Sequence, residues 1–269
     1  MNPKLIGLFA LALTAGACSS PSPQVEATVA AQDPSGVRRL PTGARLDPAG
    51  VSRDLGSMPL AMALSPEKDR IVVLLNGWRQ QGIQVVERSS GRVLQTIPLP
   101  AVFLGVVFSP DGRSLYVSGG DQDVVYRFDW RSGAATLVDS IPLAVKGKGK
   151  DGTRYPAGIA LSRDGRTLYV AENLADSVAV VDVTSRRVAQ RLATERYPYG
   201  VVVAPDGTVY ASAWGGWTVS IFPADGNGTL SVGTRARVGR HPSALALSPS
   251  GSRLFIASGS TDRISVLDT

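Results

Sequence analysis

The chain repeats one short phrase five times, and this repetition restricts its possible folds more than any other feature. The phrases are MALSPEKDRIVVL from Met62, VVFSPDGRSLYVS from Val106, IALSRDGRTLYVA from Ile159, VVVAPDGTVYAS from Val201 and LALSPSGSRLFIA from Leu245. Their matching positions, Ser65, Ser109, Ser162, Ala204 and Ser248, are 44, 53, 42 and 44 residues apart. Such a period is typical of four-stranded propeller blades. The sequence therefore predicts an all-β β-propeller of four-stranded antiparallel blades, with five repeats present.

The third repeat shows how one phrase becomes one blade. Gly158–Ser162 reads as a short apolar strand, Arg163–Arg166 as a tight turn, and Thr167–Ala171 as the next strand. Asp-Gly between two apolar runs is a strong hairpin signal, because glycine accepts a positive φ. A third strand over 178–183 and a fourth over 188–192 complete the predicted blade.

The first residues have the pattern of an export signal. A positive charge, a short apolar run and Ala15-Gly16-Ala17 precede Cys18, the only cysteine. Small residues before a lone cysteine resemble the lipobox of bacterial lipoproteins, which implies lipidation of Cys18. Cleavage without a lipid and a retained membrane anchor are the alternatives.

We therefore expect three regions along the chain. Residues 1–17 are a signal peptide, residues 18–44 are the lipidated cysteine and a flexible tether, and residues 45–269 are the propeller. The expected location is the bacterial envelope, with a lipid anchor as the only contact with the membrane. The propeller would lie in the periplasm or at the cell surface.

The segment LYVAENLADSVAVVDV, from Leu168, resembles the YVTN-type bacterial β-propellers, and the resemblance extends from about Arg45 to Thr269. The leader together with LNGW, GTRYPAG, AENLADS, ERYPYG and GRHPSAL resembles the amino-terminal propeller of exported proteins that also carry a phosphoesterase of the alkaline phosphatase superfamily. This resemblance implies a C-terminal phosphoesterase domain as partner. It also implies seven blades, so we expect a truncated seven-bladed propeller. Alternatively, the segment from Arg45 to Leu55 supplies the missing outer strand of the last blade and closes a five-bladed ring.

Two loop families should meet on one face of the propeller. In an up-and-down sheet, the connection before the first strand and the connection after the second strand emerge on the same side. The first family carries an Arg-aromatic-Pro motif three times, and the second carries most of the tryptophans. The candidate ligand-binding residues are Arg154, Tyr155, Arg196, Tyr197, Arg240, His241, Trp78, Glu172, Asn173, Trp214 and Trp217.

Arginine presents a planar fork suited to carboxylate or phosphate, and indole faces offer stacking area. We therefore predict that these loops line the mouth of the central channel and bind an anionic small molecule or an acidic loop of a protein partner. The alternative is that Arg-aromatic-Pro is a structural corner of the repeat, since it recurs in register with it.

Composition limits the chemistry further. Lys and Arg number 28 against 22 Asp and Glu, giving a formal charge of +6, which permits nucleic acid as a partner. Only Lys146–Lys150 forms a local basic cluster. One histidine and one cysteine leave no His-rich metal site and no cysteine nucleophile in the predicted domain. We predict no catalytic residue, no metal and no cofactor.

The sequence therefore favours a non-catalytic exported domain that binds a ligand or partner on its loop face and scaffolds a downstream phosphoesterase. The alternative function is that of a lactonase-like propeller hydrolysing a small polar ester or lactone.

Overall fold

The computed structural model describes residues 38–39, 43, 45–46, 50–144, 153–225 and 229–269. The chain divides into two compact units, Met1–Ser52 and Arg53–Thr269. In the first unit, β1 (Arg38–Arg39) pairs with β2 (Arg45–Leu46). The repeats lie in the second unit. This unit starts at Arg53, whereas the sequence predicts that the propeller starts at residue 45. The predicted signal peptide, Cys18, most of the tether and the basic cluster lie outside the described residues.

Each of the five repeats forms its own antiparallel sheet, with strands hydrogen-bonded in chain order. We number these sheets as blades 1 to 5. Blade 1 holds β3 (Pro59–Leu64), β4 (Arg70–Asn76), β5 (Gln81–Glu87) and β6 (Val93–Leu99). Blade 2 holds β7 (Val106–Phe108), β8 (Ser114–Ser118), β9 (Val124–Arg131) and β10 (Ala134–Pro142). Blade 3 holds β11 (Pro156–Leu161), β12 (Thr167–Glu172), β13 (Ser177–Asp182) and β14 (Arg187–Ala193).

Blade 4 holds β15 (Pro198–Val203), β16 (Val209–Ala213), β17 (Thr218–Phe222) and β18 (Thr234–Arg237). Blade 5 has three strands, β19 (Pro242–Leu247), β20 (Arg253–Ser258) and β21 (Arg263–Asp268). One-turn 3-10 helices, Gly120–Gln122 and Asn173–Ala175, follow the second strands of blades 2 and 3. The predicted propeller of antiparallel blades, with five repeats present, is confirmed.

The hairpin between the first two strands of each blade is closed by its own side chains. In blade 2 the Ser109 hydroxyl donates to Asp111 at 2.5 Å, and Asp111 accepts the backbone N–H of Arg113 at 3.0 Å. Gly112 follows with φ 70°, in the left-handed region that favours glycine. In blade 3 the Ser162 hydroxyl donates to Asp164 at 2.6 Å. These hydrogen bonds are local, which explains why four residues of sequence suffice to predict the turn.

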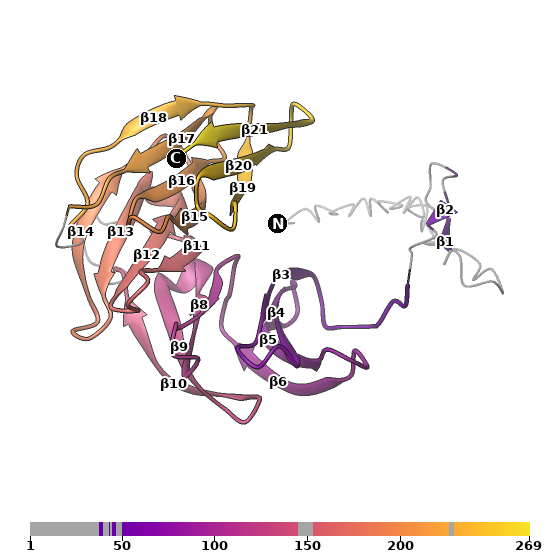
Figure 1. Ribbon diagram of the computed structural model, residues 1–269. Coiled ribbons are helices and arrows are strands. Elements are labelled where there is room, and N and C mark those ends of the chain that lie inside the picture. The colour runs from indigo at the N-terminus through magenta and orange to yellow at the C-terminus, as the bar shows by residue number, and fades with distance from the viewer. Residues whose placement is uncertain (1–37, 40–42, 44, 47–49, 145–152, 226–228) are drawn as a thin grey trace, which may run out of the picture. The chain divides into compact units, whose positions relative to one another are not determined.

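The core consists of layers between neighbouring blades. The innermost strand of each blade lies beside that of the next, from β3 to β19 (Figure 1). Between blades 1 and 2 the layer includes Leu74, Ile83 and Phe128, all fully buried. Similar layers join blades 2 and 3, blades 3 and 4, and blades 4 and 5. The second and third strands of blades 2 to 4 are therefore mostly buried, as expected for blades that pack between two neighbours.

The outward faces of the first and last blades differ in what covers them. Leu55 packs on Val73 and Leu75 of blade 1, and the N–H of Gly56 donates to the Gln84 side chain at 3.0 Å. Leu55 and Gly56 thus lie against blade 1, and among the described strands of residues 53–269 none adds a fourth strand to blade 5. Residues 53–55 of the segment that was expected, in the alternative, to close a five-bladed ring therefore form no strand on the last blade.

Candidate functional site

The two loop families meet on one face, as the sequence predicts. Backbone N–H groups of the turns after the second strands donate to carbonyls of the loops between blades. Leu174 donates to Arg154 at 3.1 Å, Trp214 to Tyr197 at 2.9 Å, and Gly259 to His241 at 3.3 Å. Three successive junctions share this arrangement, and we call this side of the propeller the loop face.

The Arg-aromatic-Pro motif has a backbone function. Tyr155, Tyr197 and His241 adopt φ values of 54°, 55° and 55°, in the left-handed region. The preceding blade holds two of them with an aspartate: Asp123 accepts the N–H of Tyr155 at 2.9 Å, and Asp176 accepts that of Tyr197 at 2.9 Å. The backbone of these loops thus forms a structural corner of the repeat, as the alternative interpretation predicts. Contacts with a ligand are left to the side chains of the motif.

Glu172 lies in an ion-pair network beneath the loop face. Its side chain is fully buried. It accepts the Ser177 hydroxyl at 2.6 Å and the Nε–H of Arg191 at 3.0 and 3.1 Å, while Nη1 of Arg154 lies 4.0 Å away. Arg191 also donates to the Leu143 carbonyl at 2.6 Å. This network ties blade 3 to the loop that precedes it, and Arg191 is not among the residues that the sequence predicts for the site.

Aromatic side chains from three blades form a second group. Phe103 packs edge-on against Tyr155, with ring centroids 5.1 Å apart, and against Tyr199 at 5.8 Å. Burial raises the pKa of both tyrosine hydroxyls. The repeat does not predict a role for Phe103 and Tyr199, because neither belongs to the recurring motif. Their packing joins the inner ends of blades 2, 3 and 4.

The junction of blades 4 and 5 carries two partly exposed indoles of the predicted site, Trp214 and Trp217. The Trp214 indole stacks on the His241 ring, with centroids 4.9 Å apart and planes 16° apart. Nδ1 of His241 lies 2.6 Å from the Ser260 hydroxyl. Trp214 and Trp217 nevertheless remain 45% and 41% exposed. The stack thus fixes Trp214 while leaving its indole accessible.

Two guanidinium groups lie over the second indole of this junction. The guanidinium carbon of Arg237 is 5.4 Å from the centre of the Trp217 ring, and that of Arg240 is 5.9 Å away. Glu195 supports the turn by accepting the N–H of Trp217 at 3.1 Å. We call Trp214, Trp217, Arg237, Arg240 and His241 the indole cluster. Four of these five residues are predicted from the sequence, and Arg237 is not.

The remaining predicted residues lie elsewhere on the loop face. Trp78 is 99% exposed in the β4–β5 connection of blade 1 and makes none of the ring contacts described above. The side-chain N–H of Asn173 donates to the Pro198 carbonyl at 3.0 Å, which ties blade 3 to blade 4. Arg196 is exposed, with its guanidinium carbon 5.3 Å from the centre of the Tyr197 ring. The structure therefore gathers only part of the predicted set.

Comparison with known proteins agrees with this architecture. Residues 145–260 match the family described as SMP-30/Gluconolactonase/LRE-like region. A seven-bladed beta-propeller protein of Mycobacterium tuberculosis is 34% identical over 121 residues, which are 42% of this chain and 29% of that protein. The match thus spans less than a third of the length of that relative.

Solved structures extend the likeness to most of the chain. A functionally unknown protein from Desulfotomaculum acetoxidans superposes with a TM-score of 0.66 at 19% identity, covering 86% of this chain and 74% of that one. The periplasmic gluconolactonase of Pseudomonas aeruginosa gives 0.62 at 20% identity, covering 78% and 66%. A putative 6-phosphogluconolactonase from Bacteroides uniformis gives 0.62 at 18%, covering 78% and 66%.

The chain is a β-propeller, and its residues 145–260 are similar to the SMP-30/Gluconolactonase/LRE-like region. At these identities the likeness to solved structures concerns the fold. Within the described residues of this propeller, no group of three His, Cys, Asp or Glu side chains is placed to hold a metal ion. Among the same residues, no helix is long and apolar enough to cross a membrane.

Proposed function

We propose that this propeller is a non-catalytic binding domain that holds an anionic sugar derivative, a sugar acid or sugar phosphate, at the indole cluster. One observation carries the proposal: two half-exposed indoles lie at one blade junction together with Arg237 and Arg240. An indole face packs well on the apolar face of a sugar ring, and a guanidinium binds carboxylate or phosphate through paired hydrogen bonds.

The comparisons support this class of ligand. Two proteins of similar fold are named as a gluconolactonase and a putative 6-phosphogluconolactonase, so they handle a sugar lactone or its phosphate. The acid forms of such compounds are anions, which the guanidinium groups of Arg237 and Arg240 would bind. The indole cluster also lies within the part of the chain that matches the SMP-30/Gluconolactonase/LRE-like region.

Calorimetric titration with gluconate, 6-phosphogluconate and glucose tests the proposal. We expect saturable binding of one or both anions and much weaker binding of neutral glucose. Trp214→Ala and Arg240→Gln should each reduce affinity about tenfold, the equivalent of about 1.4 kcal/mol. Trp78→Ala is the matched control, because that indole is exposed but outside the cluster. Equal losses for Trp78→Ala and Trp214→Ala would remove the site from the indole cluster.

We further propose that the domain is exported, lipidated at Cys18 and joined to a phosphoesterase that it presents to substrate. The support is the small-residue run before Cys18 and the loop motifs that resemble propellers of that kind. Cys18→Ser should move the protein from the membrane fraction to the soluble envelope fraction. An open reading frame past Thr269 that encodes no phosphoesterase would contradict the scaffolding role.

A lactonase is the second candidate, because the matching family region covers residues 145–260. Hydrolysis of glucono-1,5-lactone by the purified chain, measured against the spontaneous rate, distinguishes it from the first. Turnover that Trp214→Ala abolishes would make the indole cluster part of an active site. Binding of gluconate without turnover would favour the binding domain.

A further inference from the structure

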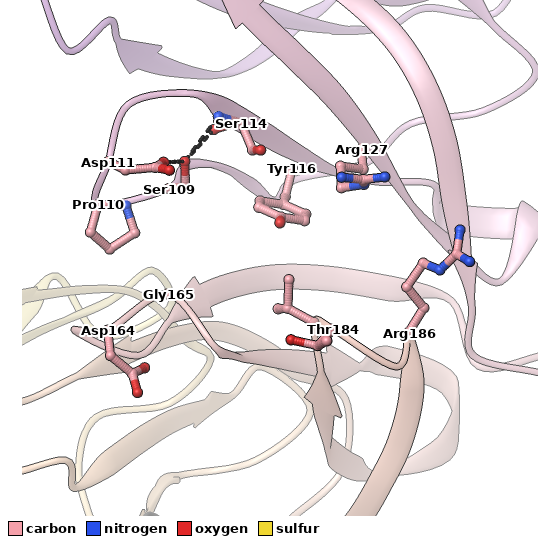
Figure 2. A pocket seen from close by; sticks show the side chains of 11 residues that line it. Ser109, Pro110, Asp111, Ser114, Tyr116, Arg127, Asp164, Gly165, Thr184 and Arg186 are labelled. Carbon is pink, nitrogen blue, oxygen red and sulfur yellow. Dashed lines mark hydrogen bonds between the residues drawn. The ribbon is translucent and has the colours of Figure 1, made fainter.

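A pocket of about 540 Å³ lies between blades 2 and 3, on the side of the propeller opposite the loop face. It is lined by the turns after the first and third strands, whereas the loop face is built from the turns after the second and fourth strands. Figure 2 shows Asp111 and Asp164 toward one end, Arg127 and Arg186 toward the other, and Tyr116 and Thr184 between them. The pocket thus has charged groups of opposite sign at its two ends.

The cationic end departs from the repeat. Arg127 pairs with Tyr116 across strands β8 and β9. The same position in the other four blades is apolar, occupied by Val85, Val180, Ile221 and Val266. A guanidinium in a position that normally packs apolar surface loses hydration, so the repeat itself gives no reason for it.

Asp139 joins the two arginines. Arg127 donates to it through Nε at 3.0 Å and Nη2 at 2.6 Å, and Arg186 of blade 3 donates through Nη1 at 3.0 Å. In blades 1 and 3 the corresponding residue is a glutamine, Gln95 or Gln190, that bonds to the backbone of the next blade. One arginine would suffice for the bridge to blade 3. The second leaves one positive charge in excess at this end.

The anionic end keeps its charge. Oδ1 of Asp111 and Oδ1 of Asp164 accept bonds from neutral groups, a serine hydroxyl and a backbone N–H in each case. Among the described residues, the one ion pair that either carboxylate makes is a 4.0 Å contact between Asp164 and Arg166, whose side chains are 61% and 81% exposed. The interaction energy of such an exposed ion pair is small, so Arg166 does little to offset the charge of Asp164. Asp129, which pairs with Ser114 of the pocket wall across strands β8 and β9, is itself paired with Arg131 at 2.7 Å.

We infer that this pocket binds a small zwitterion, with its carboxylate at Arg127 and Arg186 and its ammonium group at Asp111 and Asp164. Tyr116, which is only 3% exposed, supplies a ring edge as the floor for the carbon chain between the two groups. The site is independent of the indole cluster, because it lies at another blade junction and on the other face. An α- or ω-amino acid is the ligand class that this charge arrangement fits.

A series of unbranched ω-amino carboxylates, from glycine to 8-aminooctanoate, measures the spacing of the two ends by calorimetric titration. We expect one chain length to bind best. The carboxylate and the primary amine of that same length should each bind about tenfold more weakly, since each satisfies one end only. Equal affinity for the amino acid and for its singly charged analogues would overturn the inference. The absence of binding at ligand concentrations up to about 10 mM, roughly the dissociation constant of a very weak specific site, would overturn it as well.

Single substitutions test which end of the pocket binds the carboxylate and which binds the ammonium group. Arg186→Gln should weaken the amino acid about tenfold and leave the primary amine unchanged, whereas Asp164→Asn should weaken both. Arg187→Gln is the matched control, because it removes the same charge from an exposed neighbouring residue that does not line the pocket. Unfolding midpoints measured in parallel show whether each variant is folded. Equal effects of Arg186→Gln and Arg187→Gln would contradict the assignment. Trp214→Ala should leave amino-acid binding unchanged, so failure of the proposed function is distinguishable.

Discussion

At the residue scale, Glu172 tests whether the buried network holds blade 3 together. Its carboxylate accepts bonds from Arg191 and Ser177. Removing one partner of a buried ion pair typically costs 3–5 kcal/mol, and the 34% exposure of Arg191 places this case at the lower end. We expect Glu172→Ala to lower the free energy of unfolding by about 3 kcal/mol and Ser177→Ala by about 1 kcal/mol. Urea denaturation monitored by Trp fluorescence measures both.

Glu172→Gln serves as the control, because it keeps the volume and an acceptor oxygen and should cost less than Glu172→Ala. A cost for Glu172→Ala within about 0.5 kcal/mol, the usual range of surface substitutions, would show that the network contributes nothing.

Individual side chains were only partly predictable from the sequence. Tyr155, Tyr197 and His241 recur in register, so their common place on the loop face follows from the repeat. The partners of Glu172 do not follow from it, because Arg191 comes from another strand and the Leu143 carbonyl from the loop before the blade. Burial of a loop-face carboxylate depends on such contacts between segments distant in sequence.

At the element scale, the first hairpin of blade 1 carries a strained residue. Lys68 occupies the turn position that Gly112 holds in blade 2, and both N–H groups donate to the turn serine at 2.9 Å. Lys68 has φ 63° there, a conformation that costs a non-glycine residue about 1–2 kcal/mol. Glycine relieves that strain but gains entropy in the unfolded chain. Lys68→Gly should therefore raise the free energy of unfolding by up to about 1 kcal/mol.

The reciprocal change, Gly112→Lys, is the matched control and should destabilise the protein in the same urea titration. A loss of stability in Lys68→Gly would mean that the lysine side chain contributes more than its backbone strain costs.

Strand positions were more predictable than side-chain contacts, because the turn signals are local. In blade 3 the second strand starts at Thr167 as expected, directly after the Asp-Gly turn. The first strand begins earlier than predicted, at Pro156, since the left-handed Tyr155 ends the preceding loop there. The short 3-10 helices have no such signal, and the sequence did not indicate them.

At the scale of the whole molecule, the five-blade pattern and the grouping of loops on one face follow from the repeat. The pocket between blades 2 and 3 does not follow from the repeat, because it depends on two residues that depart from the repeat in one blade, Arg127 and Asp139. For this reason the repeat predicts the fold well. A site that occurs in one blade only is found from the side-chain contacts of that blade in the structure.

The outward face of blade 5 leads to the prediction for the whole molecule. Ile264 and Val266 of β21 are 67% and 50% exposed, and Phe255 beside Val266 is 38% exposed. Among the described strands β21 pairs only with β20, so its other edge offers free backbone groups beside this apolar stripe. Such edges and patches favour association. We expect the chain to self-associate as its concentration rises, measured by sedimentation velocity.

Ile264→Lys combined with Val266→Glu should suppress this association, because charges on an edge strand oppose pairing with another chain. Val138→Glu is the matched control, since Val138 is 51% exposed on β10, away from blade 5. Association that persists in the double variant, or that Val138→Glu abolishes equally, would place the contact elsewhere on the propeller. If the double variant alone sediments as a single monomeric species, the outward face of blade 5, against which no described blade packs, is the surface of association.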